Sequence, residues 1–278
     1  MIGSIVVLYN PSEEEIKNVN SYIDKVDFGV IIDNSTVDNE QWIFSLLDND
    51  GKIKYYSEQK NLGLCKAFNI GVGFLKQKGC DWALLFDADS KLEKDIVSIY
   101  KDAIRLYDKD QVAVFCPVHV FERSKNQPYD GYKEVKWSMT SGWLVNINIF
   151  DKQNGFFEEL FVDGLDMDYC YKSLGNGYKI IECGNAYLIH NPAETKSISI
   201  FGRKIKYGTA SPFRYYMQAR QLVWCLLNYK EKECFVLYCY KWFKVIFLFS
   251  NKKEYIRSML KGTKDGKIIY KKQKSNNI

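Results

Sequence analysis

The strongest constraint on the fold is the regular alternation of two patterns in the first 115 residues. Short apolar runs rich in β-branched residues predict strands at 5–8, 30–32, 53–55, 83–86 and 112–115. Segments with helical spacing of apolar residues lie between them, at 13–23, 41–47, 64–76 and 93–107. A repeat of strand, helix and strand predicts an α/β fold with a mainly parallel sheet covered by helices on both faces.

Polar residues follow three of these predicted strands. They are Tyr9-Asn10, Asp33-Asn34-Ser35 and Asp87-Ala88-Asp89-Ser90. Ligands of open α/β sheets bind beyond the carboxyl ends of the strands. The sequence therefore predicts a ligand site where the three clusters meet.

The third cluster carries two carboxylates one residue apart, Asp87 and Asp89, after a buried strand. Paired carboxylates bind hard cations such as Mg²⁺ or Mn²⁺, which can neutralise a diphosphate. The alternative is a solvated turn, since aspartate is common in loops. The position directly after an apolar strand favours the metal.

Five stretches in a fixed order extend this pattern to a family. They are residues 6–11, 32–35, 61–71, 85–90 and 161–169, followed by His190. Together they resemble a family-2 glycosyltransferase of the GT-A (Rossmann-like) fold, of the bacterial rhamnosyltransferase-like branch. The resemblance implies a nucleotide-sugar-binding half at 1–115 and an acceptor-binding half of the same domain at 116–228. Hydropathy and charge, rather than the resemblance, predict a C-terminal amphipathic helix and basic tail at 229–278.

The resemblance assigns donor binding to one group of residues. Tyr9 and Asn10 would border the base, and Asp33, beside Asn34, would accept the ring N–H of uracil or thymine. A turn with a helix cap is the alternative for Asp33. The remaining donor-binding residues implied by the resemblance are Asn61, Gly63, Lys66, Asn69, Asp87, Ala88 and Arg214.

The resemblance also assigns the chemistry. Asp166 occupies the position of the family's catalytic base, with Asp163 and Asp168 as rivals, although Asp168 can instead hold the following helix in place. Asp89, with Asp87 and His190, would bind Mn²⁺ or Mg²⁺.

An acceptor-binding turn is implied at Ser141-Gly142-Trp143, where the indole could stack on a sugar or pack in the core. The other histidine, His119, lacks any such context and is expected to be a hydrogen-bonded core residue. The chain departs from the family at Leu165, where an acidic residue is common, and at 191–194, where glycines are usual.

The implied activity is inverting transfer of a sugar from a dTDP- or UDP-sugar, with dTDP-L-rhamnose as the first expectation. The acceptor would be a glycan or lipid-linked glycan in synthesis of a bacterial surface polysaccharide such as a capsule. One alternative, a sugar nucleotidyltransferase, needs a glycine-rich basic loop after the first strand, where this chain has the acidic Ser12-Glu13-Glu14. Another is a non-catalytic, nucleotide-sugar-binding scaffold at a membrane.

Charge is concentrated at the C-terminus. Residues 251–278 hold nine Lys/Arg and two Asp/Glu, so the rest of the chain, whose overall net charge is +5, is slightly acidic, which argues against nucleic acid as a partner. The preceding apolar run, 234–249, is too short to span a bilayer. On a helix Lys230, Lys241 and Lys244 share one sector, so the apolar remainder could lie on the inner face of the cell membrane, or pack on the catalytic domain or a homodimer partner.

The cellular compartment is predicted from two further features. The eight cysteines form no C-x-x-C pair, and their apolar neighbours are typical of buried thiols, as in a reducing cytoplasm. Met1 leads directly into an apolar strand without the basic start and cleavage site of a secretory signal. We therefore expect a cytoplasmic protein, peripheral on the membrane if the C-terminal helix binds lipid.

Overall fold

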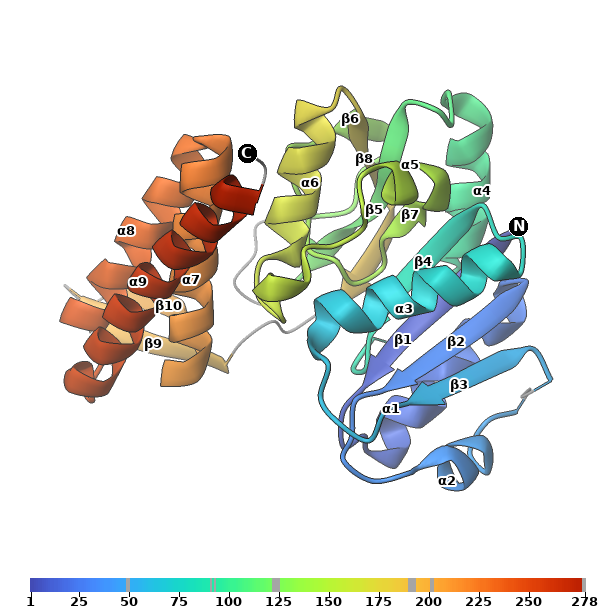
Figure 1. Cartoon of the computed structure of the whole chain (residues 1–278), viewed down its shortest axis with the longest axis horizontal. Coiled ribbons are helices and arrows are strands. Elements are labelled where there is room, and N and C mark those ends of the chain that lie inside the picture. Colours follow the sequence, from blue (N-terminus) through green and yellow to red (C-terminus); the bar gives the residue numbers. More distant parts are fainter. Residues whose placement is uncertain are drawn as a thin grey trace. The chain divides into compact units, whose positions relative to one another are not determined.

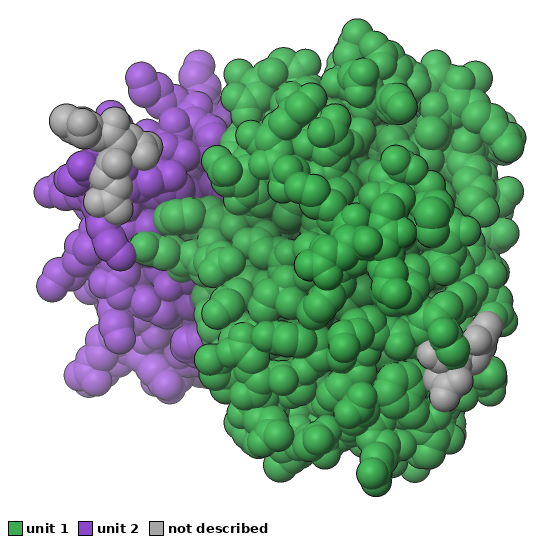
Figure 2. All heavy atoms as spheres, turned by 45° about the vertical axis from the view of Figure 1, so that its right-hand side comes forward, with its two compact units in different colours: residues 1–121, 125–161, 169–190 green, residues 122–124, 162–168, 191–278 purple. Residues whose placement is uncertain are grey.

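The protein folds as two compact units, drawn in different colours in Figure 2. The computed structural model describes residues 1–48, 51–90, 92, 94–121, 126–189, 194–200 and 203–276. Unit 1 contains residues 1–121, 125–161 and 169–190, and unit 2 contains 122–124, 162–168 and 191–278. The predicted halves at 1–115 and 116–228 were expected within one domain: residues 1–115 lie in unit 1, and residues 116–228 are divided between the two units. The predicted boundary at 228/229 falls within the last turn of a helix that ends at Tyr229.

Unit 1 is built on an eight-stranded sheet in the order β3-β2-β1-β4-β7-β5-β8-β6 (Figure 1). The strands are β1 (Ile2–Leu8), β2 (Phe28–Asp33), β3 (Ile53–Ser57), β4 (Trp82–Asp87), β5 (Val112–Val120), β6 (Tyr132–Glu134), β7 (Leu144–Asn146) and β8 (Lys179–Ile189). Strands β3, β2, β1 and β4 are parallel, as are β5 and β8, whereas β7 and β6 run antiparallel to their neighbours. The sheet is mainly parallel, as predicted.

The helices of the first half also lie where the sequence predicts them. The helices up to residue 175 are α1 (Glu13–Asn18), α2 (Glu40–Phe44), α3 (Gly63–Gln77), α4 (Ile96–Leu106), α5 (Ile147–Lys152) and α6 (Leu165–Gly175). The predicted helix at 13–23 is shorter than expected, because two 3₁₀ turns, Val19–Ser21 and Ile23–Lys25, follow α1. Beyond residue 115, the strands β6, β7 and β8 also join the central sheet.

Both faces of the sheet are covered. Ile16 of α1 and Tyr100 of α4 pack with β-strand residues such as Val6 and Phe86 in one apolar cluster. On the other face α3 lies so close to β1 that a Cβ on Gly71 would meet the Ile5 side chain at 2.7 Å. Helices therefore cover both faces of the sheet.

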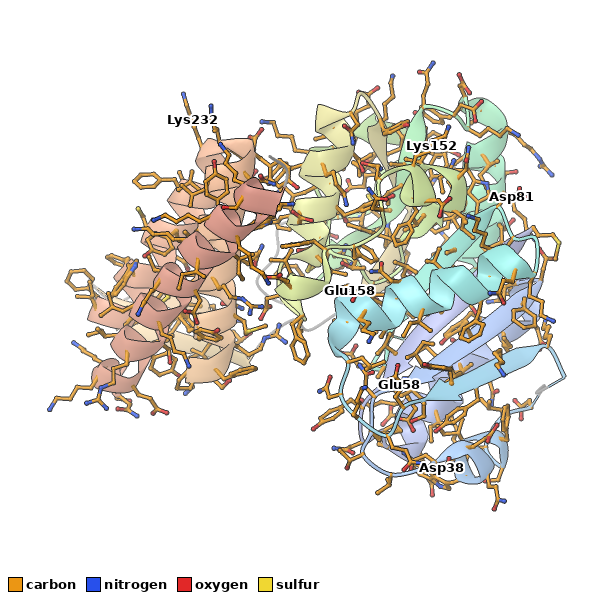
Figure 3. The ribbon with its side chains drawn as sticks, viewed as in Figure 1. Asp38, Glu58, Asp81, Lys152, Glu158 and Lys232 are labelled. Carbon is orange, nitrogen blue, oxygen red and sulfur yellow. The ribbon has the colours of Figure 1, made fainter. Side chains whose placement is uncertain are left out.

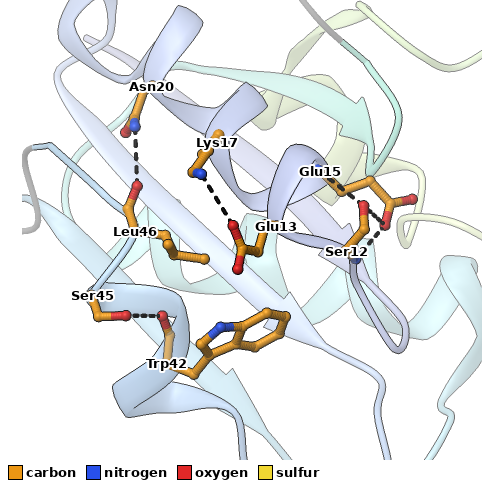
Figure 4. Close-up of polar contacts among 8 residues, drawn as sticks. All are labelled: Ser12, Glu13, Glu15, Lys17, Asn20, Trp42, Ser45 and Leu46. Atoms are coloured by element: carbon orange, nitrogen blue, oxygen red, sulfur yellow. Dashed lines mark hydrogen bonds and ion pairs between the residues drawn. The ribbon is translucent and has the colours of Figure 1, made fainter.

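A capping box begins α1 immediately beyond β1 (Figure 4). The Ser12 hydroxyl accepts a bond from the Glu15 backbone N–H at 3.3 Å, and the Glu15 carboxylate accepts one from the Ser12 N–H at 2.7 Å. Lys17 pairs with Glu13 at 3.1 Å on the same helix. The acidic residues after the first strand therefore serve the start of a helix.

Unit 2 holds the C-terminal helical segment. Its main elements are the antiparallel strands β9 (Glu194–Ile200) and β10 (Arg203–Thr209) and the helices α7 (Pro212–Tyr229), α8 (Lys232–Phe247) and α9 (Lys252–Asn276). Ser211 caps α7, and Lys230 ends it in the left-handed conformation at φ 59°. Tyr215, Val245 and Met259, one from each helix, share an apolar core. Within the described ranges, we find no helix whose length and hydropathy would let it cross a membrane.

Candidate functional site

The carboxyl ends of β2 and β4 flank the end of β1. Leu8 pairs with Asp33 on one side, and Val7 pairs with Asp87 on the other. The chain runs outward from β1 through β2 to β3 and then returns to β4, so this edge is a topological switch point. The predicted convergence of the three polar clusters is confirmed.

Asp33 is buried, with 0% of its surface exposed, and both of its oxygens accept hydrogen bonds. Oδ1 accepts from the Ser35 N–H at 2.9 Å, and Oδ2 accepts from the Asn39 amide at 2.8 Å and the Tyr55 hydroxyl at 3.0 Å. Burial, and then this bond to Asp33, raise the pKa of Tyr55 to about 12. The sequence did not single out the two side-chain donors, Asn39 and Tyr55, because they come from a loop and from another strand.

Around the end of β1, Tyr9 is 54% exposed. Asn10, at φ 47°, donates its backbone N–H to the Ser35 hydroxyl at 2.8 Å. The side chain of Asn34 is buried, and its Oδ1 accepts from the Leu62 N–H at 3.4 Å. These bonds join the ends of β1 and β2 to the start of α3.

The start of α3 depends on a glycine. Gly63 has φ +76°, and its N–H donates to the Asn61 side chain at 2.9 Å. A Cβ at this position would lie 2.6 Å from the carbonyl oxygen of Phe161, which accepts a bond from the Cys65 N–H at 3.2 Å. Segment 61–63 is therefore shaped by backbone packing, and the half-buried Lys66 follows one turn later.

Asn69 does not present an unoccupied amide to a donor. Its Oδ1 accepts from the Phe156 N–H at 2.9 Å, while its Nδ2 donates to the Phe156 carbonyl at 3.0 Å and to Glu158 at 3.1 Å. Glu158 is labelled beside α3 in Figure 3. Asn69 thus positions segment 156–158, and its role in donor binding stays a prediction.

Asp87 ends β4 half-buried, and Asp89 is exposed in the turn that follows, with Ala88 half-buried between them. The Ser90 N–H donates to the Asp87 carbonyl at 3.0 Å and closes the turn. Oxygen donors of this kind fit Mg²⁺ or Mn²⁺. The described residues contain no cluster of three or more His, Cys, Asp or Glu side chains suited to a metal ion, and His190 lies outside them.

The acidic run Asp163–Asp168 lies in unit 2 with the C-terminal helices. Arg214 of α7 donates to Asp163 at 2.9 Å, with 45% of the arginine side chain and 11% of the aspartate exposed. Burial raises the pKa of Asp163, and the Arg214 guanidinium opposes this shift. Lys241 of α8 also faces this carboxylate; it donates to Gln218 at 2.6 Å, and burial lowers its pKa to about 8.

Asp166 and Asp168 share the first turn of α6 but have different surroundings. Asp168 is 2% exposed, and its Oδ1 accepts from the Trp224 indole at 2.8 Å and the Tyr229 hydroxyl at 2.7 Å. Asp166 is only half-buried, and its Oδ1 accepts from the Met167 N–H at 2.8 Å. Asp168 therefore fixes α6 to α7, the alternative left open for it, and Asp166 is the more accessible carboxylate.

The turn at Ser141-Gly142-Trp143 is buried. The Ser141 hydroxyl lies 2.5 Å from the Ser90 hydroxyl. The Ser141 carbonyl oxygen lies 2.8 Å from Nε2 of the buried His119. Trp143 is 0% exposed and contacts the Tyr169 ring at 6.2 Å between centroids. Core packing is thus the correct alternative for Trp143, and His119 is the hydrogen-bonded core residue expected.

Comparison with known proteins decides the family. Residues 5–167, more than half of the chain, match the family described as Glycosyl transferase family 2. The chain belongs to glycosyltransferase family 2. It is also 26% identical to dTDP-rhamnosyl transferase RfbF of Shigella flexneri over 296 aligned residues, covering 95% of each chain, so it is rhamnosyltransferase-like. Of the two enzymatic alternatives, nucleotidyl transfer is therefore disfavoured.

Solved structures of other glycosyltransferases share the fold, which is GT-A. S. aureus TarS 1–349 in complex with UDP-GlcNAc superposes with a TM-score of 0.58 at 15% identity, over 92% of this chain and 79% of that one. GalNAc-T7 with UDP, GalNAc and Mn²⁺ gives 0.59 at 13% identity, over 93% of this chain and 54% of that one. The chain thus spans about half the length of GalNAc-T7.

Proposed function

We propose that this family-2 glycosyltransferase transfers a sugar, with inversion, from a dTDP- or UDP-sugar to a glycan or lipid-linked glycan acceptor in bacterial surface polysaccharide synthesis. The observation that carries the proposal is the junction of Asp33, Asn34 and the Asp87–Asp89 turn around the end of β1. The likeness of the chain to RfbF, over 95% of its length, makes dTDP-L-rhamnose the first donor to test. A cytoplasmic site of action follows if the donor is a soluble nucleotide sugar.

In this proposal the donor's base lies against Tyr9 and Asn10 and is read by Asp33. Lys66 and the start of α3 face its phosphates, because a helix N-terminus and a lysine both favour negative charge. The planar guanidinium of Arg214 would donate hydrogen bonds to the diphosphate and would give up part of its ion pair with Asp163.

The carboxylate of Asp166 would take the proton from the acceptor hydroxyl while that oxygen attacks the anomeric carbon. The nucleoside diphosphate leaves from the opposite face with the bonding electrons, which inverts the configuration. Asp163 is the less suitable base, since its Oδ1 is bonded to Arg214.

Asp87 and Asp89 would hold Mn²⁺ or Mg²⁺, with His190 as the further ligand that the family resemblance implies. The bound cation would supply charge neutralisation for the departing diphosphate. GalNAc-T7 and a mannosyltransferase from Pyrobaculum calidifontis were each crystallised with Mn²⁺.

A donor panel tests the proposal. Purified protein with Mn²⁺ is incubated with each dTDP- and UDP-sugar, and released nucleotide and product anomer are measured. We expect the highest turnover with dTDP-L-rhamnose, inversion at the anomeric carbon, and loss of turnover with EDTA or in Asp89→Asn. Complete inactivity toward every donor, with a folded protein, would refute glycosyl transfer and favour the non-catalytic scaffold.

A further inference from the structure

Helix α8 turns two lysines inward, while six of its large apolar side chains are exposed. Lys244 is 6% exposed, and its ammonium donates to the Gly208 carbonyl at 2.9 Å and lies 5.5 Å from the ring centre of Tyr215. Lys241 points inward as well, toward Gln218 of α7. An amphipathic helix of a globular protein normally buries its apolar face and exposes its charged residues.

The outward face of α8 is strongly apolar. Six of the sixteen large apolar side chains that the described part of the chain exposes lie on this one helix: Phe235, Val236, Tyr240, Phe243, Ile246 and Phe247. At 100° per residue they occupy one continuous face. Phe243 and Phe247 form a pair with ring centres 4.9 Å apart and exposures of 50% and 64%. An exposed apolar patch of this kind marks an interaction surface.

The neighbouring helix α9 presents a basic face. Its exposed residues include Arg257, Lys261, Lys264, Lys267 and Lys271. Of the two acidic residues in α9, Asp265 is bonded to the Tyr216 hydroxyl at 2.9 Å. The exposed surface of α9 is therefore strongly positive.

The two helices that carry the apolar and basic faces pack on the same helix of unit 2 and contact each other. Helix α9 packs on α7 through Gly262 and Gly266, where an added Cβ would overlap α7 backbone atoms. Helix α8 contacts the same helix through Lys241 and Lys244. Tyr238 of α8 and Thr263 of α9 share a hydrogen bond of 2.6 Å, so the two helices are neighbours, and Figure 1 draws them side by side.

We propose that the apolar face of α8 and the basic face of α9 form the surface with which this protein docks on an anionic lipid bilayer. Apolar side chains enter the boundary between headgroups and acyl chains, while lysines attract the negative lipid surface. A second copy of the chain fits less well, because a two-fold contact on α8 would bring two basic α9 faces toward each other. Docking does not depend on which sugar is transferred.

Vesicle co-sedimentation of the full chain tests this proposal. Wild type should bind vesicles that contain phosphatidylglycerol, bind phosphatidylcholine vesicles weakly, and lose binding as salt is added. Phe243→Ser with Phe247→Ser should weaken partitioning by about tenfold per phenylalanine, since each ring is about half exposed in solution. Lys264→Gln with Lys271→Gln should weaken only the binding to anionic vesicles, by roughly fivefold per lysine.

Two matched controls sit on the other unit: Leu106→Ser, at a side chain 69% exposed on α4, and Lys109→Gln, at an exposed lysine. Both should bind vesicles like wild type. The proposal is overturned if wild type ignores anionic vesicles, or if the phenylalanine variant, with unchanged circular dichroism, binds them normally. It is also overturned if light scattering shows a dimer that the phenylalanine variant converts to a monomer without any loss of lipid binding.

Discussion

Asp166 and Asp168 lie two residues apart on α6, and the structure predicts opposite consequences when each is changed. In Asp168→Ala, the Trp224 indole and the Tyr229 hydroxyl lose the carboxylate that accepts both of their hydrogen bonds. Trp224 is 1% exposed, so water cannot readily replace the lost acceptor. At about 1–3 kcal/mol for each bond to a buried donor, the free energy of unfolding should fall by about 2–6 kcal/mol.

Asp166→Asn should behave differently. The side chain is half-buried and the change preserves its shape, so we expect the stability to stay within about 0.5 kcal/mol of wild type. Turnover should fall by about 10²–10⁴-fold, because the amide cannot take the acceptor proton. Donor affinity should not change.

The assay pairs thermal unfolding with turnover at saturating donor. At about 2–4 °C per kcal/mol, Asp168→Ala should unfold about 4–24 °C below wild type. Asp168→Asn retains one acceptor oxygen, so its melting temperature should lie between those of Asp168→Ala and wild type. An unchanged melting temperature in Asp168→Ala would refute its assignment as the link between α6 and α7, and full turnover in Asp166→Asn would remove it as the base.

Three further predictions concern stability. Gly63→Ala should destabilise the protein by roughly 2–4 kcal/mol, since its Cβ would meet the Phe161 carbonyl at a positive φ. Gly73→Ala in the same helix, where nothing lies within 4 Å of the added carbon, should stabilise the protein by up to about 1 kcal/mol. Equal urea midpoints for the two variants would contradict this prediction. Asn69→Ala should lower the free energy of unfolding by about 1–3 kcal/mol through its lost bonds to segment 156–158, and an unchanged urea midpoint would show that these bonds contribute little. The pKa of Lys241 is lowered to about 8, so between that pH and the ordinary lysine pKa of 10.5 the unfolded state binds more protons than the folded state. As the pH rises through this range, wild type should therefore gain stability relative to Lys241→Met. Parallel curves of melting temperature against pH for the two proteins would exclude the pKa shift.

The first half of the fold was predictable because its signals are local. Each strand and helix up to residue 115 carries its own periodicity, and the order of strands and helices then implies which strand ends share an edge. Strand β7 was not predicted, since three residues, Leu144–Asn146, show no period and become a strand only through pairing with β4 and β5. Long-range pairing of this kind leaves no trace in a short segment.

The candidate site shows the same limit. The sequence located Asp33, Asp87 and Asp89 at the sheet edge, because strand order alone brings them together. It could not show that the amide of Asn69 is occupied by Phe156, or that Trp143 packs against Tyr169, because both depend on segments far along the chain. Residue type and spacing identify a site, whereas long-range contacts decide which of its side chains are available.

The orientation of α8 links the acidic run to the proposed lipid surface. Lys241 turns inward toward the buried carboxylate of Asp163, whose charge offsets part of the desolvation of the ammonium. The rotation of the helix that brings Lys241 and Lys244 inward beside Val245 leaves Phe243, Ile246 and Phe247 on its exposed side. Inward and outward substitutions should therefore separate cleanly: Lys241→Met should alter the pH dependence of stability while vesicle binding persists, and Phe243→Ser should do the reverse. If either substitution moved both properties to the same extent, α8 would be responding as a whole, and the division of its faces would be wrong.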